Sequence, residues 1–361
     1  MVARRVTINN ARRPSTASRI VSAAAGAVTD CLVRRLSLVY VSAMANLRLT
    51  LSCGDYDRTR FLIEGKVATP GIDLEVIPLA SPERHARFTR SLEFDVCELQ
   101  MGVFLGWKSR GVPVTAIPVF PHVKFCHGAV VVHSEGGIER PEDLRGKRIG
   151  LQAHFNPIAV WMRGVLKHEH GVAPGEMRWI TNSREQVSPW EPPEWLHVEQ
   201  APAGRRVPEM LEAGEIDAYM LPTIGSAFRA GKSVGRRLWP DYREVEADYY
   251  RRTGIYPLRH TVVIKDEILE RHPWVAETLL QAFEEAKVRG LEYMRDPRRS
   301  YLAWYGEAIE EDEKVLGRDP FPYSVEAQRH ALDTMLLYAS EQAVTTRRLS
   351  VDELFAPSTL R

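Results

Sequence analysis

The chain of 361 residues is poor in cysteine and contains no long apolar run. Its four cysteines stand far apart, without a CxxC pair or a zinc-ligand spacing, at Cys31, Cys53, Cys97 and Cys126. We therefore expect no disulfide framework, and a reducing cytoplasm is the expected compartment. No apolar stretch reaches the roughly 18 residues that a membrane-spanning helix needs, so no membrane span is expected.

Net charge is also nearly absent, at +1 for the whole chain, but it is unevenly distributed. Residues 1–43 contain seven arginines and one acidic residue, Asp30, so the remainder of the chain is mildly acidic. An acidic body exerts no long-range attraction on nucleic acid or on anionic membranes. The charge pattern therefore argues against a nucleic-acid partner.

The N-terminal segment, residues 1–45, differs in composition from the rest. It is rich in Arg, Ser and Ala, like a transit peptide, and Arg34-Arg35 followed by the apolar Leu36–Val41 resembles a signal peptide. That apolar stretch is shorter than the roughly 7–15 residues of a signal-peptide core. We interpret residues 1–45 as a disordered extension, or as sequence upstream of a true start at Met44. A cleaved targeting signal, with a periplasmic protein, is the alternative.

Alternating strand-like and helix-like segments organise the remainder. The length favours two domains, because single cores stop growing near roughly 250–300 residues. Apolar strand patterns are interleaved with helical ones, which is typical of parallel α/β sheets. Residues 182–204 are rich in proline and are expected to form a loop, and helices are expected near 298–309 and 325–342. The expected strands lie at 47–53, 72–79, 114–120, 128–133, 216–221 and 261–265, and two further strands are expected to begin at 94–96 and at 146–150.

Two phrases, Glu142–Gly150 and Met210–Ala218, resemble the helix-to-strand junctions of type II periplasmic-binding-protein-like folds. In each, a glycine ends a helix and an apolar run enters a parallel strand. The resemblance implies two parallel-rich sheets flanked by helices, joined by a hinge of two crossover strands. We expect one lobe to comprise residues 46–126 and 260–361, and the other to comprise residues 127–259.

A narrower resemblance extends over nearly all of residues 46–360. The chain is similar to the 4,5-dihydroxyphthalate decarboxylase family at Gly54–Arg60, Glu93–Val96, Ala116–Pro121, Arg252–Pro257, His260–Ile264 and His272–Val275. The resemblance implies a lyase without an organic cofactor, which removes one carboxylate from a hydroxylated aromatic di-acid and gives protocatechuate. A non-catalytic substrate-binding protein of an ABC-type transporter is the alternative. Either would bind a small carboxylated aromatic ligand, and a homo-oligomer is left open.

The chain departs from the family pattern at three strand ends, namely residues 98–102, 152–156 and 221–225. Strand ends of this kind face the ligand cleft in open α/β sheets. The framework is therefore expected to be retained while the pocket differs in detail.

Four residues after the first strand, Gly54, Asp55, Tyr56 and Arg58, are candidates for ligand binding or catalysis. In Gly54-Asp55-Tyr56-Asp57-Arg58, Arg58 could hold a carboxylate in a two-point bond, Tyr56 could stack on a ring, and Asp55 could act as a base for a phenol. The alternative is that Asp55 or Asp57 caps the next helix and that Arg58 pairs with an acid on the surface.

Glu98 and two histidines complete the expected catalytic set. Glu98 is a second candidate base, and His127 or His154 would deliver a proton to the ring. The alternative for each histidine is a structural hydrogen bond. A metal site of His122, His127 and Glu98 lacks a recognised spacing, so no metal is predicted. Further residues expected to bind substrate are Gln100, Lys124, Phe125, Gln152, Asn156, Trp161, Thr223 and His260. The hypothesis requires Asp55, Glu98, His127 and His154 to converge on one crevice.

Overall fold

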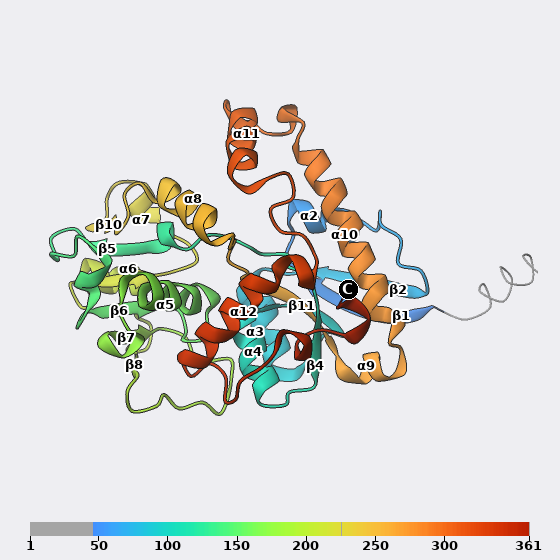
Figure 1. Ribbon diagram of the computed structural model, residues 1–361, viewed down its shortest axis with the longest axis horizontal. Coiled ribbons are helices and arrows are strands. Elements are labelled where there is room, and N and C mark those ends of the chain that lie inside the picture. The colour runs from blue at the N-terminus through green and yellow to red at the C-terminus, as the bar shows by residue number, and fades with distance from the viewer. Residues whose placement is uncertain (1–45, 225, 361) are drawn as a thin grey trace, which may run out of the picture. The chain divides into compact units, whose positions relative to one another are not determined.

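The computed structural model describes residues 46–224 and 226–360. The two interpretations of residues 1–45 concern a segment outside these described residues. The strands of the described chain form two separate sheets, as the sequence predicts (Figure 1). Among the described helices, none combines the length and apolarity that a membrane crossing requires.

The first sheet has the strand order β2-β1-β3-β11-β4. β1 and β3 are parallel, whereas β11 runs antiparallel to both β3 and β4. β3 is a continuous buried run, which places Glu98 at the centre of the sheet. The bounds are Leu47–Cys53 for β1, Ile72–Pro78 for β2, Val96–Gln100 for β3, Val114–Ile117 for β4 and His260–Lys265 for β11.

The second sheet has the order β10-β5-β9-β6-β7-β8. β9, β6, β7 and β8 are parallel neighbours, while β5 is antiparallel to β9 and β10. β8 lies in the segment expected to be a loop. The sequence does not predict this strand because its side chains are mostly exposed and give no apolar signal. The bounds are Val130–His133 for β5, Arg148–Leu151 for β6, Arg178–Thr181 for β7, His197–Gln200 for β8, Ala218–Met220 for β9 and Gly235–Arg237 for β10.

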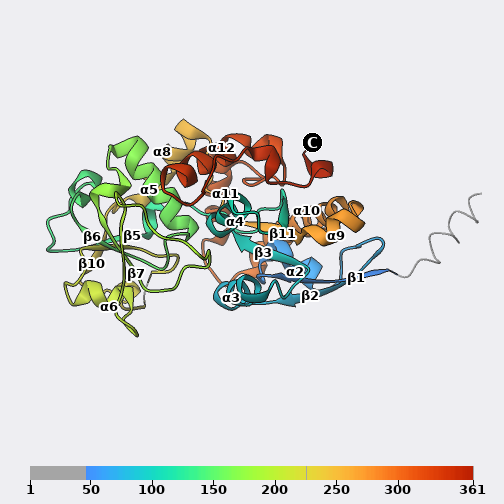
Figure 2. The same cartoon turned by 90° about the horizontal axis from the view of Figure 1, so that it is seen from below.

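Helices flank both sheets, and several of them begin and end where local chemistry dictates (Figures 1 and 2). In α5, the Asn156 side chain accepts from the Ile158 amide at 3.0 Å and Gly171 ends the helix with a φ of 64°. The helices are α2 (Asp57–Ile63), α3 (Ser81–Ser91), α4 (Met101–Ser109), α5 (Pro157–His170), α6 (Val207–Glu212), α7 (Ser226–Arg229), α8 (Tyr242–Thr253), α9 (Asp266–Arg271), α10 (Trp274–Met294), α11 (Tyr305–Leu316) and α12 (Val325–Glu341).

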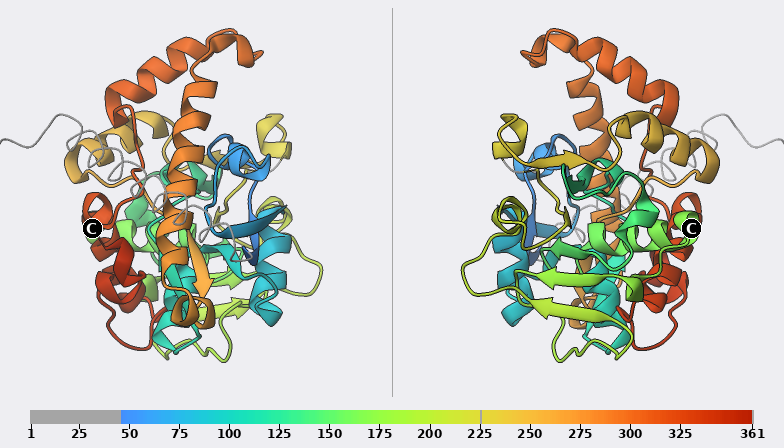
Figure 3. Two further views of the ribbon diagram at one scale, coloured as in Figure 1. Left: turned by 90° about the vertical axis from the view of Figure 1, so that its right-hand side faces the viewer. Right: turned by 90° about the vertical axis from the view of Figure 1, so that its left-hand side faces the viewer.

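The last two helices only partly match the expectation. α12 agrees with the helix expected near 325–342, and α11 begins at Tyr305 rather than near residue 298. The chain turns between α10 and α11 at the top of both views in Figure 3, through a short 3-10 turn at Pro297–Arg299. Proline at the first position of that turn accounts for the interruption.

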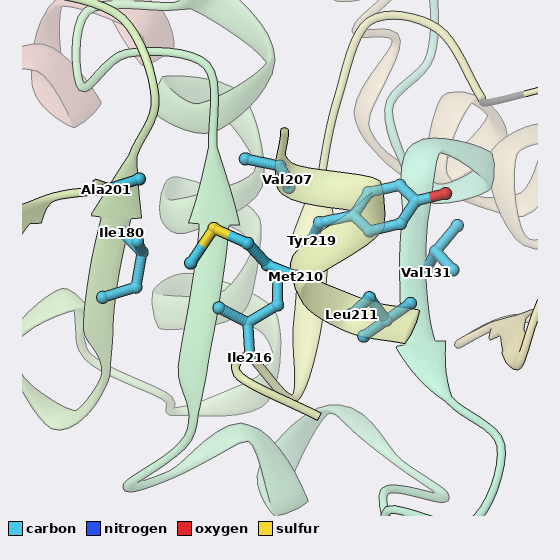
Figure 4. Close-up of a cluster of buried hydrophobic side chains, with 8 residues drawn as sticks. All are labelled: Val131, Ile180, Ala201, Val207, Met210, Leu211, Ile216 and Tyr219. Carbon is cyan, nitrogen blue, oxygen red and sulfur yellow. The ribbon is translucent and has the colours of Figure 1, made fainter. Parts of the chain in front are cut away.

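An apolar cluster fills one face of the second sheet, where α6 packs on the strands (Figure 4). Its members come from the strands, from α6 and from the turns beside them: Val131, Ile180, Ala201, Val207, Met210, Leu211, Ile216 and Tyr219. All eight are buried, so this face is a closed core. Ligand binding must therefore occur at the strand ends rather than through this face.

Two crossover segments join the sheets and run antiparallel to each other. The Lys124 amide donates to the Pro257 carbonyl at 3.2 Å, the Arg259 amide donates to the His122 carbonyl at 2.9 Å, and Val123 and Leu258 form an isolated bridge. This pairing places the side chains of residues 122–124 beside those of 259 and 260.

A third connection is made by the C-terminal helix. α12 packs against α5, and the Tyr338 ring meets Trp161 edge-on at 5.7 Å. Contact is so close at Gly164 that an added Cβ would lie 2.0 Å from Tyr338. The C-terminal part of the chain, which follows β11, therefore packs through α12 against α5, a helix that flanks the second sheet.

Candidate functional site

A pocket of about 860 Å³ is lined by residues that follow strands of both sheets and by the two crossovers. Its polar lining includes Tyr56, Gln100, His122, Lys124, Gln152, Asn156, Asn182, Arg259 and His260. A hollow of about 850 Å³ lies between α8 and α11, away from the strand ends, and is lined mainly by surface charges. Polar groups converge in the first of these two spaces, which makes it the candidate site.

Glu98, from β3, stands behind the pocket wall and is fully buried. Its Oε1 accepts from the Tyr56 hydroxyl at 3.1 Å and contacts an Arg84 nitrogen at 3.0 Å, and its Oε2 accepts from the Gly54 amide at 2.8 Å. Burial raises the pKa of Glu98, but Arg84, His260 and these hydrogen bonds outweigh it and hold the pKa well below the usual value. Glu98 is therefore an ionised carboxylate whose oxygens are already occupied.

His260, at the start of β11, lines the pocket and is bound to Glu98 from behind, with 2.5 Å between Nδ1 and Oε1. Because an ionised carboxylate only accepts, the Nδ1 atom carries the proton and Nε2 keeps a lone pair. Burial lowers the pKa of His260 despite the charge of Glu98. A neutral imidazole with a fixed tautomer is a base, and Glu98 would stabilise its protonated form.

Three residues of this cluster were not proposed for it from the sequence. Arg84 is fully buried, and its Nη1 also donates to the Leu79 carbonyl at 2.6 Å. Its pKa is lowered by burial but raised overall by the Glu98 charge. The His85 ring is 5.0 Å from the ring of His260 and its Nδ1 lies 3.0 Å from the Gln100 amide. Charged residues in a helix normally indicate a solvent-facing side, so the sequence gives no signal for Arg84.

His122 is the third of these residues, and sequence reasoning considered it only as a metal ligand. Its ring meets that of His260 edge-on at 4.6 Å, and its buried Nδ1 has no hydrogen-bond partner among the described residues. Burial lowers the pKa of His122 to about 2, so it is neutral near pH 7. The described residues contain no group of three or more His, Cys, Asp or Glu side chains arranged to hold a metal ion.

Seven of the residues expected to bind substrate line the pocket: Tyr56, Gln100, Lys124, Gln152, Asn156, Thr223 and His260. Gly54 contributes its amide to Glu98 rather than to the pocket surface. Phe125 lines an adjoining hollow of about 290 Å³. These positions all follow strands or lie on a crossover, as the fold class requires.

Asp55 and Arg58 differ from the expectation. Asp55 is exposed and is not part of the pocket lining. The Arg58 guanidinium pairs with Asp57 at 2.8 Å, donates to the Pro121 carbonyl and lies 4.3 Å from the centre of the Tyr56 ring. The alternative of an ion pair with an acid thus fits Arg58, which also supports the Tyr56 ring, whereas no side-chain cap by Asp55 is found at the start of α2.

His127, His154 and Trp161 also lie outside the pocket lining. Aromatic neighbours enclose His127, with Trp239 at 5.1 Å and Tyr249 at 5.4 Å between ring centres, and burial lowers its pKa to about 4. His154 is stacked on Trp190, and the Trp161 indole donates to the Leu258 carbonyl at 2.8 Å. Of the four residues expected to converge, only Glu98 reaches the site, because tight aromatic packing holds both histidines elsewhere.

The two sheets, the paired crossovers and a pocket at the strand ends define the class of two-lobed periplasmic-binding-protein folds. The sulfonate-binding protein SsuA of an ABC transporter from Methylobacillus flagellatus matches with a TM-score of 0.54 and 13% identity, over 88% of this chain and 94% of that one. Residues 68–190 match the family model described as NMT1/THI5 like.

Curated relatives give the family. The chain is 32% identical to 4,5-dihydroxyphthalate decarboxylase of Comamonas testosteroni over 326 residues, 88% of this chain and 98% of the relative. It is 32% identical to the protein of the same name from Pseudomonas putida over 215 residues, 58% of this chain and 83% of the relative. The chain belongs to the 4,5-dihydroxyphthalate decarboxylase family.

Proposed function

We propose that this protein is a cofactor-independent decarboxylase of a hydroxylated aromatic di-acid such as 4,5-dihydroxyphthalate, with protocatechuate and CO₂ as products. Membership of the family supports the reaction class. The observation that carries the proposal is the pairing of a buried, ionised Glu98 with a pocket-lining His260.

The reaction needs a base at a phenol and a proton at a ring carbon. In 4,5-dihydroxyphthalate each hydroxyl stands para to one carboxylated carbon, so a phenolate raises electron density where the proton must add. Protonation there, followed by cleavage of the bond to the carboxylate, releases CO₂ and restores the aromatic ring. Overall, one proton is taken up for each CO₂ released.

His260 is the group that we assign to the phenol. Its Nε2 lone pair would accept the phenolic proton, and Glu98 would stabilise the imidazolium through Nδ1. Tyr56 and Arg84 fix the carboxylate so that it does not turn toward the substrate itself. Glu98 is thereby a positioning residue, in place of the base expected from the sequence.

The test is product analysis with the purified protein and 4,5-dihydroxyphthalate. We expect equal amounts of CO₂ and protocatechuate, and we expect His260→Asn to lower kcat by about 100-fold or more. Phthalate, which has no hydroxyl, should bind to both proteins without releasing CO₂. Tight binding of 4,5-dihydroxyphthalate without any turnover would contradict the proposal and favour a substrate-binding protein.

A further inference from the structure

Arg259 presents a buried positive charge at the pocket wall. Its side chain is 2% exposed, and its Nε and Nη2 atoms donate to the carbonyls of Lys124 and Phe125 at 3.0 and 2.5 Å. Nη2 also lies 3.5 Å from the sulfur of Cys126. Neither an acidic side chain in a salt bridge nor an acceptor for Nη1 is found for this guanidinium among the described residues.

Lys124 adds a second positive charge at the same wall. It is exposed, lines the pocket together with Arg259, and forms no salt bridge with a described residue. The adjoining hollow of about 290 Å³ shares both residues and is lined further by Arg229, Arg237 and a single carboxyl group.

That carboxyl group, Glu246, does not neutralise the wall. Its Oε1 accepts from the Gly128 amide at 2.8 Å, and no salt bridge joins it to a described cation. Burial raises its pKa, although the nearby charges of Arg259 and Lys124 lower it, so Glu246 lies near both cations without forming an ion pair with either. A buried guanidinium without an anionic partner is costly, so the missing negative charge is expected to come from the ligand.

We propose that Arg259 and Lys124 form the subsite for the carboxylate that decarboxylation leaves in place. The inference rests on the proposed function and assigns the residues that hold the second carboxylate of the di-acid. A guanidinium offers a planar fork that suits a carboxylate. The crossover carbonyls fix this fork before the ligand arrives, so little side-chain freedom is lost on binding. Arg58, which the sequence suggested for this role, is instead engaged with Asp57.

Phthalate is a suitable probe because it carries both carboxylates and cannot react. Calorimetry at low salt should show binding to the whole protein weakened about tenfold or more by Lys124→Gln and by Arg259→Lys, which keeps the charge but loses the fork. Lys232→Gln is the matched control, since Lys232 is exposed and lies outside the pocket lining. It should bind phthalate like the original protein. Benzoate, with one carboxylate, should bind more weakly than phthalate and lose less on either substitution.

Phthalate affinity tests the carboxylate subsite, and CO₂ release tests the proposed function, so the two can fail independently. Unchanged phthalate affinity in both Lys124→Gln and Arg259→Lys would overturn the subsite, even if CO₂ is released normally. Loss of phthalate binding in these variants would support it, even if 4,5-dihydroxyphthalate proves unreactive. Should Arg259→Lys fold poorly because Arg259 ties the crossovers together, Lys124→Gln and the phthalate-to-benzoate ratio still decide the question.

Discussion

Two clusters that each contain an arginine, a glutamate and a histidine lie in the protein, and all of these side chains except Glu185 are buried. Arg84, Glu98 and His260 belong to the first sheet and its helices, whereas Arg163, Glu185 and His154 belong to the segments around the second. In the first cluster the carboxylate contacts both the arginine and the histidine. In the second, the carboxylate instead accepts from the backbone amides of residues 154 and 155.

The difference reverses the electrostatics. The charge of Arg84 helps to hold the pKa of Glu98 below its usual value, whereas burial raises the pKa of Glu185. Burial on its own would lower the pKa of Arg84, but the charge of Glu98 outweighs it and the pKa is raised. Burial lowers the pKa of Arg163 to about 9. Direct pairing favours the charged forms of Arg84 and Glu98. Without such a pair, burial shifts the pKa values of Arg163 and Glu185 toward their neutral forms.

The two clusters differ in whether their histidine faces the pocket. His260 lines the pocket, whereas His154 is covered by Trp190 and its Nε2 lies 2.9 Å from the Gln342 carbonyl. Arg163 donates to the Gln342 side chain at 2.8 Å, just beyond the end of α12. The second cluster therefore fastens the C-terminal segment, while the first faces the ligand.

Removing the carboxylate charge should have the largest effect where it is paired. Glu98→Gln leaves Arg84 buried and unpaired, and breaking such a pair costs about 3–5 kcal/mol of unfolding free energy. Glu185→Gln keeps an oxygen for the backbone amides and should cost only about 1 kcal/mol. Urea unfolding of both variants measures the difference, and equal losses would show that the two carboxylates are equivalent.

Crowding at the α5–α12 contact should have an intermediate effect. Gly164→Ala brings a methyl group against Tyr338, and overpacking of this kind costs about 1–3 kcal/mol. Gly306→Ala is the matched control, because nothing lies within 4 Å of the added Cβ in α11. It should stabilise the chain by about 0.4–1 kcal/mol, since alanine restricts the unfolded chain. Thermal unfolding separates the pair, and a harmless Gly164→Ala would argue against a tight fastening.

The pH dependence of stability should show the smallest effect. Burial, then the Arg163 charge, keep the pKa of His154 well below 6.5 in the folded state, so the unfolded chain binds a proton first as the pH falls. Stability should therefore decrease below pH 6.5, by up to about 1.4 kcal/mol per pH unit for each such group. His154→Asn should remove one proton from that slope between pH 6.5 and 5. An unchanged slope in the variant would show that His154 is protonated in the folded protein.

Glu98 also makes the protein less stable as the pH falls, but in a lower pH range than His154. Because its folded pKa is depressed, its contribution is present above the usual value of 4.5 and is lost as the pH falls below it. Unfolding free energies measured from pH 4.5 to 3 should thus fall less steeply in Glu98→Gln than in the original protein.

Strong periodic patterns made much of the fold predictable. The apolar runs of β3 and β11 and the long helix α12 were legible because core packing demands such spacing. β8 was not, since an exposed edge strand carries no apolar signal. Mixed strand directions also escaped prediction, because pairing partners far apart in sequence decide them.

The candidate site was predictable only where strand ends fix it. Glu98, Gln100 and His260 are neighbours across β3 and β11, and Tyr56 follows β1 directly. Arg84 escaped notice because an arginine in a helix is normally solvated, and nothing local indicates its buried partner. His154 was assigned to the cleft because the sequence does not show that α12 and Trp190 cover it.

Turnover by two histidine variants tests the central claim most directly. CO₂ release from 4,5-dihydroxyphthalate should be compared, per folded molecule, for His260→Asn and His154→Asn. We predict a loss of about 100-fold or more for His260→Asn and nearly full activity for His154→Asn, once its lower stability is allowed for. Full activity in His260→Asn, or an equal loss in both variants, would contradict the assignment of the chemistry to the Glu98–His260 pair.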